Sequence, residues 1–390
     1  MPLRFLTAGE SHGPALVAIL EGLPAGLPVD LEAVNRELAR RQQGLGAGPR
    51  MKIEADRAVI LSGVLEGVTT GAPIAVQIEN RDHTKWRGRA VEPMTVPRPG
   101  HVDLAAALKY GYRDLRPGLE RASARETAAR VAVGALCKQF LRAFGIVIGS
   151  YVVQIGPIRA ELPEDLPYPL RLERAETDPV RCPDPEASAR MQAVIEQVIR
   201  EKDTLGGVIE GVALGVPPGL GSHVHWDRRL SARLMMALGS IPAVKGVEIG
   251  EGFALAGRRG TEAQDGIFRE GEALVRRTHR AGGIEGGISN GAPIVVRVAF
   301  KPIATTLTPQ PSVDLRTGQP TETRYERSDF CPVPRAGPIV EAMMAFVLAD
   351  ALLEKLGGDT MEECRSRFEV LRKAQLNDLL LDGEPHIFWP

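Results

Sequence analysis

Apolar residues recur along this chain with two periods, which together predict alternating strands and helices. The runs at 16–20 and 208–214 are apolar and are each followed by a turn of glycine and proline, as buried strands commonly are. Alternating apolar residues at 74–78 and 294–298 predict one further strand in each half of the chain. The pattern therefore favours an α/β protein, in the broad sense that includes α+β folds.

Helical spacing follows the strands of this pattern. Leu31, Val34 and Leu38 share one face of a predicted helix, and Asp30 is a suitable N-cap because its carboxylate can accept a backbone N–H of the first turn. The stretch from Pro157 to Asp184 shows no period, so we expect an irregular surface connection there. Further helices are predicted at about 127–136, 190–202 and 229–238.

Short sequence features return in the same order in the second half of the chain. A Gly/Pro turn and a Gly-Ala-Pro-Ile sequence occur at 22–27 and 71–74, and again at 215–220 and 291–294. This repetition indicates two similar α/β halves, at about 9–140 and 205–353. We expect them to form one catalytic domain over residues 1–356, followed by a C-terminal tail at 357–390.

Composition and charge disfavour several classes of function. The 390 residues include 48 basic and 49 acidic side chains, so no net charge attracts nucleic acid or an acidic membrane, and we interpret the basic, aromatic run at 85–89 as a solvated loop. No uninterrupted apolar run approaches the roughly 18 residues that span a bilayer, and the first ten residues do not resemble a secretory signal. The four cysteines are far apart, so we expect neither a metal site nor disulfides. A cytoplasmic protein with no nucleic-acid or membrane partner fits these features.

Two histidines lie in glycine-bounded loops, where few apolar neighbours can bury them. His12 follows Gly9-Glu10-Ser11 directly before a predicted strand, and His101 follows a Pro-Gly turn close to Arg98. An imidazole titrates near neutral pH, so either ring could transfer a proton. The cation beside His101 makes most sense if both face a bound anion. A solvated loop histidine and a histidine that caps a helix remain the alternative interpretations.

A phosphate site is predicted at the sequence Arg-Ala-Ser-Ala-Arg-Glu-Thr, residues 121–127. Ser123 and Glu126 have the spacing of a capping box, and a helix of small residues continues from Thr127. The N-terminus of a helix offers free N–H groups to an anion, and its dipole disfavours Arg121 and Arg125 there unless an anion binds. An ordinary capped helix is the alternative.

Three further sequences contain groups suited to binding a ligand. The loop Gly-Gly-Ile-Glu-Gly-Gly at 282–287 permits a close approach of the backbone to a ligand. Lys301 and Thr305 offer a cation and a hydroxyl, and Arg327-Ser328-Asp329 precedes Arg335 by a few residues. Each of these signals is weak when taken alone.

Taken together and in order, these motifs resemble the chorismate synthase family over residues 9 to about 345. The motifs are Gly-Glu-Ser-His-Gly, Arg-Pro-Gly-His-x-Asp, Ser-Ala-Arg-Glu-Thr, the double-glycine loop and Arg-Ser-Asp. The resemblance implies a β-α-β sandwich of two pseudo-repeated halves, assembled as a homotetramer. It also implies a carbon–oxygen lyase that needs reduced FMN and removes phosphate from 5-enolpyruvylshikimate 3-phosphate by trans-1,4-elimination. The product, chorismate, completes the last common step of the shikimate pathway of aromatic amino acid biosynthesis.

The resemblance also implies roles for individual residues. His12 would protonate or orient the flavin, His101 would assist the departing phosphate, and Asp329 would help to move a proton through flavin N5. The positions that match flavin contacts of the family are Arg121, Ala122, Ser123, Pro242, Ala243, Gly286, Lys301, Pro302, Ile303, Ala304, Thr305 and Arg327. Those that match substrate contacts are Arg41, Arg50 and Arg125, whose guanidinium groups can bind carboxylate or phosphate in a bidentate manner.

The chain departs from the family pattern at three positions. Ala47 stands where an arginine is common, and Pro242 and His279 stand where asparagine occurs in some members. We therefore expect part of the anchoring of substrate or flavin to differ around Ala47.

Two other classes of function remain as alternatives. A flavin-dependent oxidoreductase would need a nicotinamide site, yet no GxGxxG sequence follows a predicted strand, so we expect a separate reductase to supply the reduced flavin. A non-catalytic flavin or anion binder would leave His12, His101 and Asp329 without a role.

Overall fold

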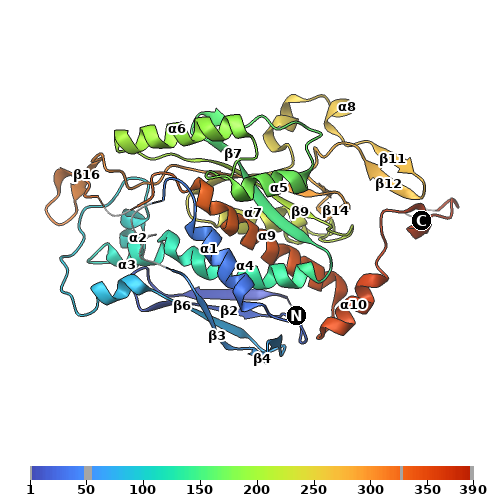
Figure 1. Cartoon of the computed structure of the whole chain (residues 1–390), viewed down its shortest axis with the longest axis horizontal. Coiled ribbons are helices and arrows are strands. Elements are labelled where there is room, and N and C mark those ends of the chain that lie inside the picture. Colours follow the sequence, from blue (N-terminus) through green and yellow to red (C-terminus); the bar gives the residue numbers. More distant parts are fainter. Residues whose placement is uncertain (1, 48–54, 326–327, 387–390) are drawn as a thin grey trace.

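Two antiparallel sheets enclose a layer of helices in the computed structural model, which describes residues 2–47, 55–325 and 328–386 (Figure 1). The first sheet has the strand order β1-β2-β6-β3, with β1 (Arg4–Ala8), β2 (Ala15–Glu21), β6 (Ile74–Glu79) and β3 (Ala58–Ser62). The second has the order β10-β15-β9-β7-β8, with β10 (Val244–Ile249), β15 (Ile294–Phe300), β9 (Gly207–Leu214), β7 (Val147–Ile155) and β8 (Ile158–Arg159). The expected β-α-β sandwich is confirmed.

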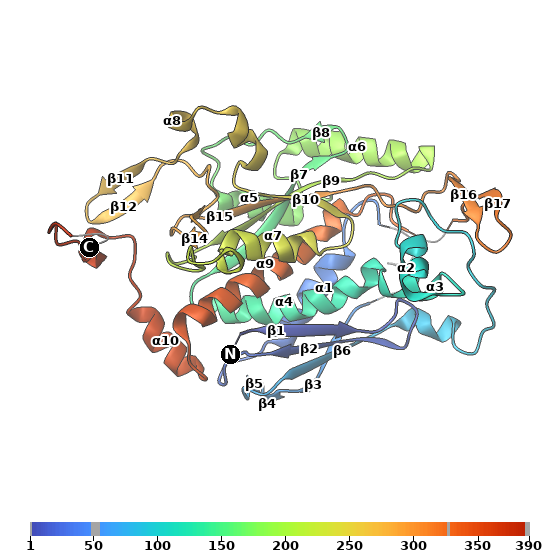
Figure 2. The same ribbon diagram turned by 180° about the vertical axis from the view of Figure 1, so that it is seen from behind.

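The middle layer consists of α1 (Leu31–Gln42), α4 (Thr127–Arg142), α7 (Leu230–Gly239) and α9 (Val333–Leu356), seen between the sheets from behind in Figure 2. Helices α4 and α9 approach so closely that a Cβ atom added to Gly134 would lie 2.2 Å from the Cβ of Ala342. Small residues at this crossing therefore allow the two halves of the chain to share one core.

Helix α9 lies at the centre of that core. In the part of the chain that the structure describes, it is the one helix long and apolar enough to cross a membrane. Most of it is buried inside the fold, as is usual for the core helix of a globular protein. The ring of Phe346 on α9 meets that of Phe5 on β1 with centroids 4.8 Å apart, so α9 reaches both sheets.

Period-two patterning determines which side of the first sheet is buried. On β2, Leu16, Ala18 and Leu20 face the helices and are almost fully buried. The opposite face of this sheet exposes four large apolar side chains, those of Leu6, Ile19, Val59 and Leu61. The second sheet is more deeply enclosed, because α9 covers one face and α5 (Tyr168–Thr177) packs against β7.

The predicted helices are confirmed with small changes at their ends. Asp30 is the N-cap of α1, and its carboxylate accepts the N–H of Ala33 at 3.0 Å. The helix expected at 190–202 begins earlier, since α6 spans Pro185–Glu201 with Asp184 as its cap.

The interpretation of 157–184 as irregular was wrong, because this stretch forms β8 and α5. Helix α5 escapes an apolar-face search because its buried positions include Arg171. The Arg171 guanidinium donates to the backbone carbonyls of Pro163 and Leu166, which satisfies a buried charge by hydrogen bonding. The tail also holds more structure than expected: α10 (Met361–Glu369) begins with a capping box of Thr360 and Glu363.

The remaining elements are short and lie around the sandwich. The helices are α2 (Asp103–Tyr110), α3 (Arg116–Arg121) and α8 (Gly260–Ala263), with 3₁₀ turns at Arg81–Lys85, Ala124–Glu126, Trp226–Arg228, Gly252–Gly257 and Leu376–Asp378. The strand pairs are β4 (Val64–Leu65) with β5 (Val68–Thr69), β11 (Ile267–Glu270) with β12 (Ala273–Arg276), β13 (Ile284–Glu285) with β14 (Ile288–Ser289), and β16 (Pro311–Asp314) with β17 (Gln319–Glu322).

The two sheets share a topology that the proposed duplication predicts. In each half, a long strand (β2 or β9) pairs antiparallel with the strand of the repeated Gly-Ala-Pro-Ile sequence (β6 or β15). A helix of the middle layer, α1 or α7, follows the first of these strands along the chain. The division into two halves within one domain stays our interpretation of this correspondence.

Candidate active site

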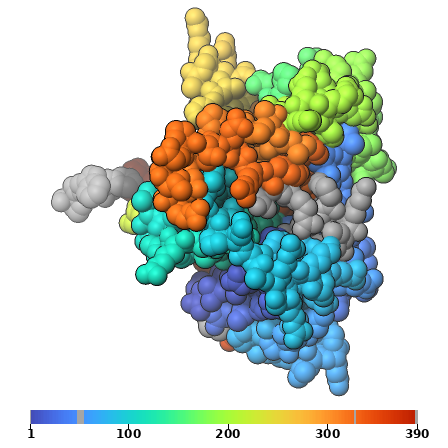
Figure 3. All heavy atoms as spheres, turned by 90° about the vertical axis from the view of Figure 1, so that its left-hand side faces the viewer, coloured from blue at the N-terminus to red at the C-terminus, as the bar shows by residue number. Residues whose placement is uncertain are grey.

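A cavity of about 860 Å³ lies where loops from both halves meet the start of α4 and of α9. Its walls come from β1 and the loop after it, the turn at 98–102, the end of α3, the segment that follows β15 and the residues before α9. Figure 3 shows, on one face of the molecule, the segment near residue 90, α2 and the hairpin β16–β17 packed side by side. The volume is in the range of pockets that hold small molecules and cofactors, about 300–1,000 Å³.

The cavity is strongly cationic although the chain as a whole is nearly neutral. Among the residues that the structure describes, two carboxylates line it, those of Glu126 and Asp329, against seven cationic side chains. The seven cationic side chains that line it are Arg41, Arg98, Arg121, Arg125, Arg130, Lys301 and Arg335. Such a local excess favours ligands that carry several negative charges.

Arg41, Arg125 and Arg335 form a buried cluster, in which Arg41 and Arg125 contact Asp56 and Arg335 contacts the backbone carbonyl of Arg41. Arg125 donates to the Asp56 carboxylate at 2.5 Å, and Arg41 approaches its other oxygen at 3.4 Å. Burial lowers the pKa of Arg41 to about 9; the neighbouring Asp56 opposes this shift, whereas Arg335 and Arg125 add to it. An anion bound here would relieve the repulsion among the three guanidinium groups.

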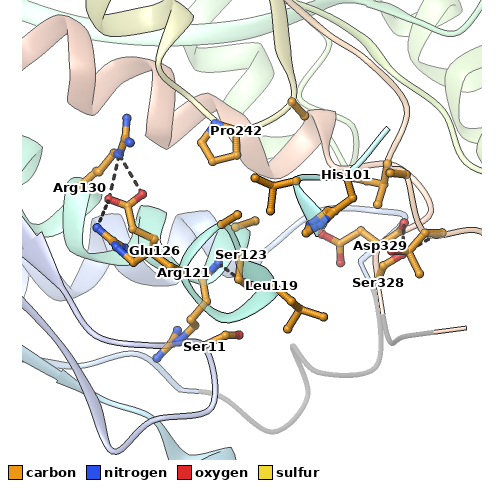
Figure 4. Close-up of a pocket in the computed structure, with 18 of the residues that line it drawn as sticks. Ser11, His101, Leu119, Arg121, Ser123, Glu126, Arg130, Pro242, Ser328 and Asp329 are labelled. Carbon is orange, nitrogen blue, oxygen red and sulfur yellow. Dashed lines mark hydrogen bonds and ion pairs between the residues drawn. The ribbon is translucent and has the colours of Figure 1, made fainter. Parts of the chain in front are cut away.

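Asp329 is held by the first turn of α9. A terminal nitrogen of Arg335 lies 2.8 Å from each oxygen of its carboxylate. The side chain of Asp329 is about one-fifth exposed and borders the cavity. In Figure 4, Asp329 and His101 lie on one side of the cavity, with Glu126 and Arg130 on the other.

His101 belongs to a three-residue network with Arg98 and Asp103. Its Nδ1 lies 2.5 Å from an oxygen of Asp103, and Arg98 donates to both oxygens of the same carboxylate, at 2.8 and 3.0 Å. Burial raises the pKa of Asp103, but the hydrogen bonds from His101 and Arg98 outweigh this and hold the pKa well below its ordinary value. The carboxylate of Asp103 can only accept a hydrogen bond from Nδ1 of His101, whereas a terminal nitrogen of Arg98, 2.9 Å from the same atom, can only donate, so the two neighbours compete for Nδ1.

His12 has a carboxylate partner of its own, Glu120 at the end of α3. The Nδ1 of His12 lies 2.6 Å from an oxygen of Glu120, and the ring stacks obliquely on Trp86 with centroids 4.6 Å apart. Both proposed proton-transfer histidines therefore have a carboxylate at Nδ1 and a side chain that borders the cavity.

The start of α4 differs from the predicted capping box. The Ser123 hydroxyl accepts the N–H of Arg125 at 3.3 Å, but the Glu126 carboxylate turns instead to Thr7 and Arg130. The first turn, Ala124–Glu126, is a 3₁₀ turn. The pairing with Arg130 explains the difference, because a charge-assisted bond is stronger than the bond to a neutral backbone N–H.

Fourteen of the predicted site residues line this one cavity. They are His12, Arg41, His101, Arg121, Ala122, Ser123, Arg125, Pro242, Ala243, Lys301, Ile303, Ala304, Thr305 and Asp329. Pro302 and Gly286 are not among the lining residues; Gly286 is exposed in the turn between β13 and β14. Arg50 and Arg327 lie outside the residues that the structure describes.

Sequence reasoning missed several residues of the site. Trp86 lines the cavity, although the run at 85–89 was expected to be a solvated loop. Glu120 and Asp56 lie beside site residues through contacts that span 108 and 69 positions, respectively, and no local motif reveals such contacts. Within the described part of the chain, no group of three or more His, Cys, Asp or Glu side chains could hold a metal ion.

The fold and the cavity define an α+β protein with a cationic cavity, which favours small ligands that carry several negative charges. The chorismate synthase family model matches residues 3–353. Curated relatives named chorismate synthase are 55% identical in Symbiobacterium thermophilum (94% of this chain, 97% of the relative) and 54% identical in Aquifex aeolicus (94% and 96%). A crystal structure of a chorismate synthase superposes with a TM-score of 0.77 at 48% identity, covering 95% of this chain and 97% of that one.

The chain therefore belongs to the chorismate synthase family. By this membership it is an enzyme, a lyase of the shikimate pathway.

Proposed function

We propose that the cavity binds reduced FMN next to 5-enolpyruvylshikimate 3-phosphate and eliminates phosphate and the C6 hydrogen to give chorismate. The observation that carries this proposal is the convergence of seven cationic side chains and two histidine–carboxylate pairs on one cavity. The substrate carries two carboxylates and a phosphate, and FMN carries a further phosphate. The excess of positive charge in the walls matches that set of anions.

The arginine cluster is suited to hold the substrate. Arg41 and Arg125 are fixed by Asp56, and Arg335 is fixed by Asp329, so their guanidinium groups are already oriented before a ligand binds. Orientation in advance reduces the entropy lost on binding. A bidentate contact from a guanidinium to a carboxylate or phosphate then sets the position of the reacting carbons.

The residues around Arg121 fit a flavin nucleotide. Ala122, Ser123 and Ala124 are small and leave room beside the wall, while Arg121, Lys301 and Thr305 supply cations and a hydroxyl for phosphate and ring oxygens. Burial, together with nearby Lys245, lowers the pKa of Lys301, so an anion at this ammonium would be favoured. When bound, reduced FMN supplies transient electron donation that eases cleavage of the C–O bond.

Proton transfer is assigned to three side chains of this wall. His101 borders the cationic cavity with Arg98 beside it, which suits assistance to the departing phosphate. His12 would present its other ring nitrogen to the flavin, and the carboxylate of Asp329, which borders the same cavity, would accept a proton.

Phosphate release under anaerobic conditions tests the proposal. Purified protein with the substrate should release phosphate when dithionite has reduced the FMN, and should be inactive with no FMN or with oxidised FMN alone. A flavin-dependent oxidoreductase would instead consume NADPH, and a non-catalytic binder would release no phosphate under any of these conditions. Either result would refute the assignment.

We further propose that a separate, NADPH-dependent reductase supplies the reduced flavin and that the chain assembles as a homotetramer in a reducing cytoplasm. The exposed apolar side chains on the outer face of the first sheet support self-association. Four buried, unbridged cysteines fit a reducing compartment. Turnover with NADPH and oxidised FMN, in a preparation free of reductase, would contradict the first proposal, and light scattering that gives a monomer would contradict the second.

A further inference from the structure

Glu120 contacts the loop of His12 at three points. One oxygen of its carboxylate lies 2.6 Å from Nδ1 of His12, and the other accepts the backbone N–H of His12 at 2.8 Å. The backbone carbonyl of Glu120 accepts the N–H of Ser11 at 3.2 Å. A single residue at the end of α3 therefore fixes both the loop and the imidazole ring.

These contacts determine which ring nitrogen of His12 carries a proton. Burial raises the pKa of Glu120, but the hydrogen bonds from His12 bring it below its ordinary value, so the side chain is a carboxylate at neutral pH. A carboxylate can only accept, and Nδ1 must therefore donate. Among the described residues, Nε2 of His12 has no hydrogen-bond partner, and His12 borders the cavity.

Two further contacts hold the ring and the backbone of His12. Trp86 packs against the ring, and His83 donates from Nδ1 to the backbone carbonyl of His12 at 2.9 Å. The side chains of His12 and Glu120 are only 19% and 12% exposed. The tautomer and the direction of the ring are thus determined by the fold rather than by solvent.

The two histidines of the site differ in how their carboxylates are shared. Asp103, the partner of His101, also pairs with Arg98. Within the described ranges, no arginine or lysine forms an ion pair with Glu120. Arg116 adds only a longer-range attraction to Glu120, and both oxygens of the carboxylate contact His12, so the loss of this carboxylate affects one histidine and leaves the other intact.

We propose that Glu120 is the positioning residue for proton transfer at His12, holding the Nδ1–H tautomer so that Nε2 faces the reacting groups. The inference rests on the proposed function of the cavity and adds a residue to it. Glutamine cannot take over this role, because it has one acceptor oxygen and would have to meet both Nδ1–H and the backbone N–H of His12.

The test is a ¹⁵N magic-angle-spinning spectrum of histidine-labelled protein, in which the seven histidines are few enough to resolve. The His12 signals, assigned by their loss in His12→Gln, should show a proton on Nδ1 in the wild type. Glu120→Gln should move them towards the Nε2–H form. It should also lower phosphate release on the order of 10- to 100-fold, the range found for carboxylates that orient metal-bound histidines, while FMN binding is retained.

A matched control is available on the surface. His225 and Asp227 form a pair of the same kind, with Nδ1 2.8 Å from the carboxylate, but the two side chains are 61% and 56% exposed and do not line the cavity. Asp227→Asn should change the signals of His225 only and leave phosphate release unchanged. Unchanged His12 signals in Glu120→Gln would overturn the proposal.

A double substitution separates positioning from general stability. If Glu120 acts through His12, then Glu120→Gln should cause no further loss of phosphate release in a His12→Gln background. Independent, additive losses would overturn the proposal. Failure of the wild-type protein to release phosphate would refute the proposed function itself, whereas an unchanged spectrum beside normal wild-type turnover refutes only the role of Glu120.

Discussion

Replacing the carboxylate of Glu341 by an amide tests how the two halves are held together at the centre of the molecule. Glu341 lies on α9 and is fully buried. Its oxygens accept from Arg40 on α1 at 2.8 Å, from Lys138 on α4 at 2.5 Å and from Ser150 on β7 at 2.6 Å. One side chain therefore connects three other elements.

The expected decrease in the free energy of unfolding follows from the charges that remain after the substitution. In Glu341→Gln the amide removes a buried counterion of two half-buried cations, Arg40 and Lys138, and breaking a buried ion pair costs about 3–5 kcal/mol. Glu37 also pairs with both Arg40 and Lys138, at 2.7 and 2.8 Å, and so offsets part of the loss. We therefore expect the free energy of unfolding to fall by about 3 kcal/mol, the lower end of that range.

Glu354→Gln is the matched control, since Glu354 lies on the same helix and also pairs with two arginines, Arg228 and Arg233. Its side chain is 44% exposed, so its loss should cost less than about 1 kcal/mol. Urea unfolding of the three proteins at one protein concentration, followed by circular dichroism, gives the comparison. Equal midpoints for Glu341→Gln and Glu354→Gln would refute the reasoning.

Three further outcomes are expected. Burial raises the pKa of Glu341, but Lys138 and Arg40 outweigh this and hold the pKa well below 4.5. The stabilisation from this carboxylate is therefore present above pH 4.5 and is lost as the pH falls through the folded-state pKa. Urea midpoints of wild type and Glu341→Gln should converge in acid, and convergence at higher pH would contradict this reasoning. Gly134→Ala should destabilise the protein by about 1–3 kcal/mol, because the added methyl group clashes with Ala342, although alanine has the better helix propensity. Gly239→Ala is the control and should not destabilise, because no heavy atom lies within 4 Å of the added Cβ. Equal thermal midpoints of the two variants would contradict this. His12→Ala and His101→Ala should each retain FMN binding in a fluorescence titration but lose phosphate release by roughly 10²–10⁴-fold, and near-normal turnover would end their assignment to proton transfer.

Local sequence patterns predicted most elements of this fold because the physics behind them is local. Asp30 caps α1 as expected, since an N-cap depends only on residues within one turn. Helix α5 was missed because its buried Arg171 is satisfied by carbonyls of the preceding loop, a solution that hydropathy does not register.

The site shows the same division between local and distant contacts. The motifs that contain His12, His101 and Asp329 could be found from sequence, and the structure brings them to one cavity. Their partners could not be found in this way. The pairing of Glu120 with His12 spans 108 positions, and the ring contact of Trp86 with His12 depends on how a loop folds over the site. Glu126 shows a second kind of failure: the local capping-box motif was present, but the carboxylate pairs instead with Arg130, one turn further along the helix, and with the distant Thr7.

The central position of α9 has a consequence for the order in which the molecule can be completed during synthesis. The first sheet is finished by residue 79, yet the helix that covers part of its inner face, and that supplies Arg335 to the site, comes at 333–356. Most of the chain must therefore leave the ribosome before the core can close, and until then the apolar face of α4 that packs against α9 is exposed. Contacts of such long sequence separation form slowly. Nascent chains that lack α9 should consequently be the form most prone to aggregate and the one most in need of a chaperone.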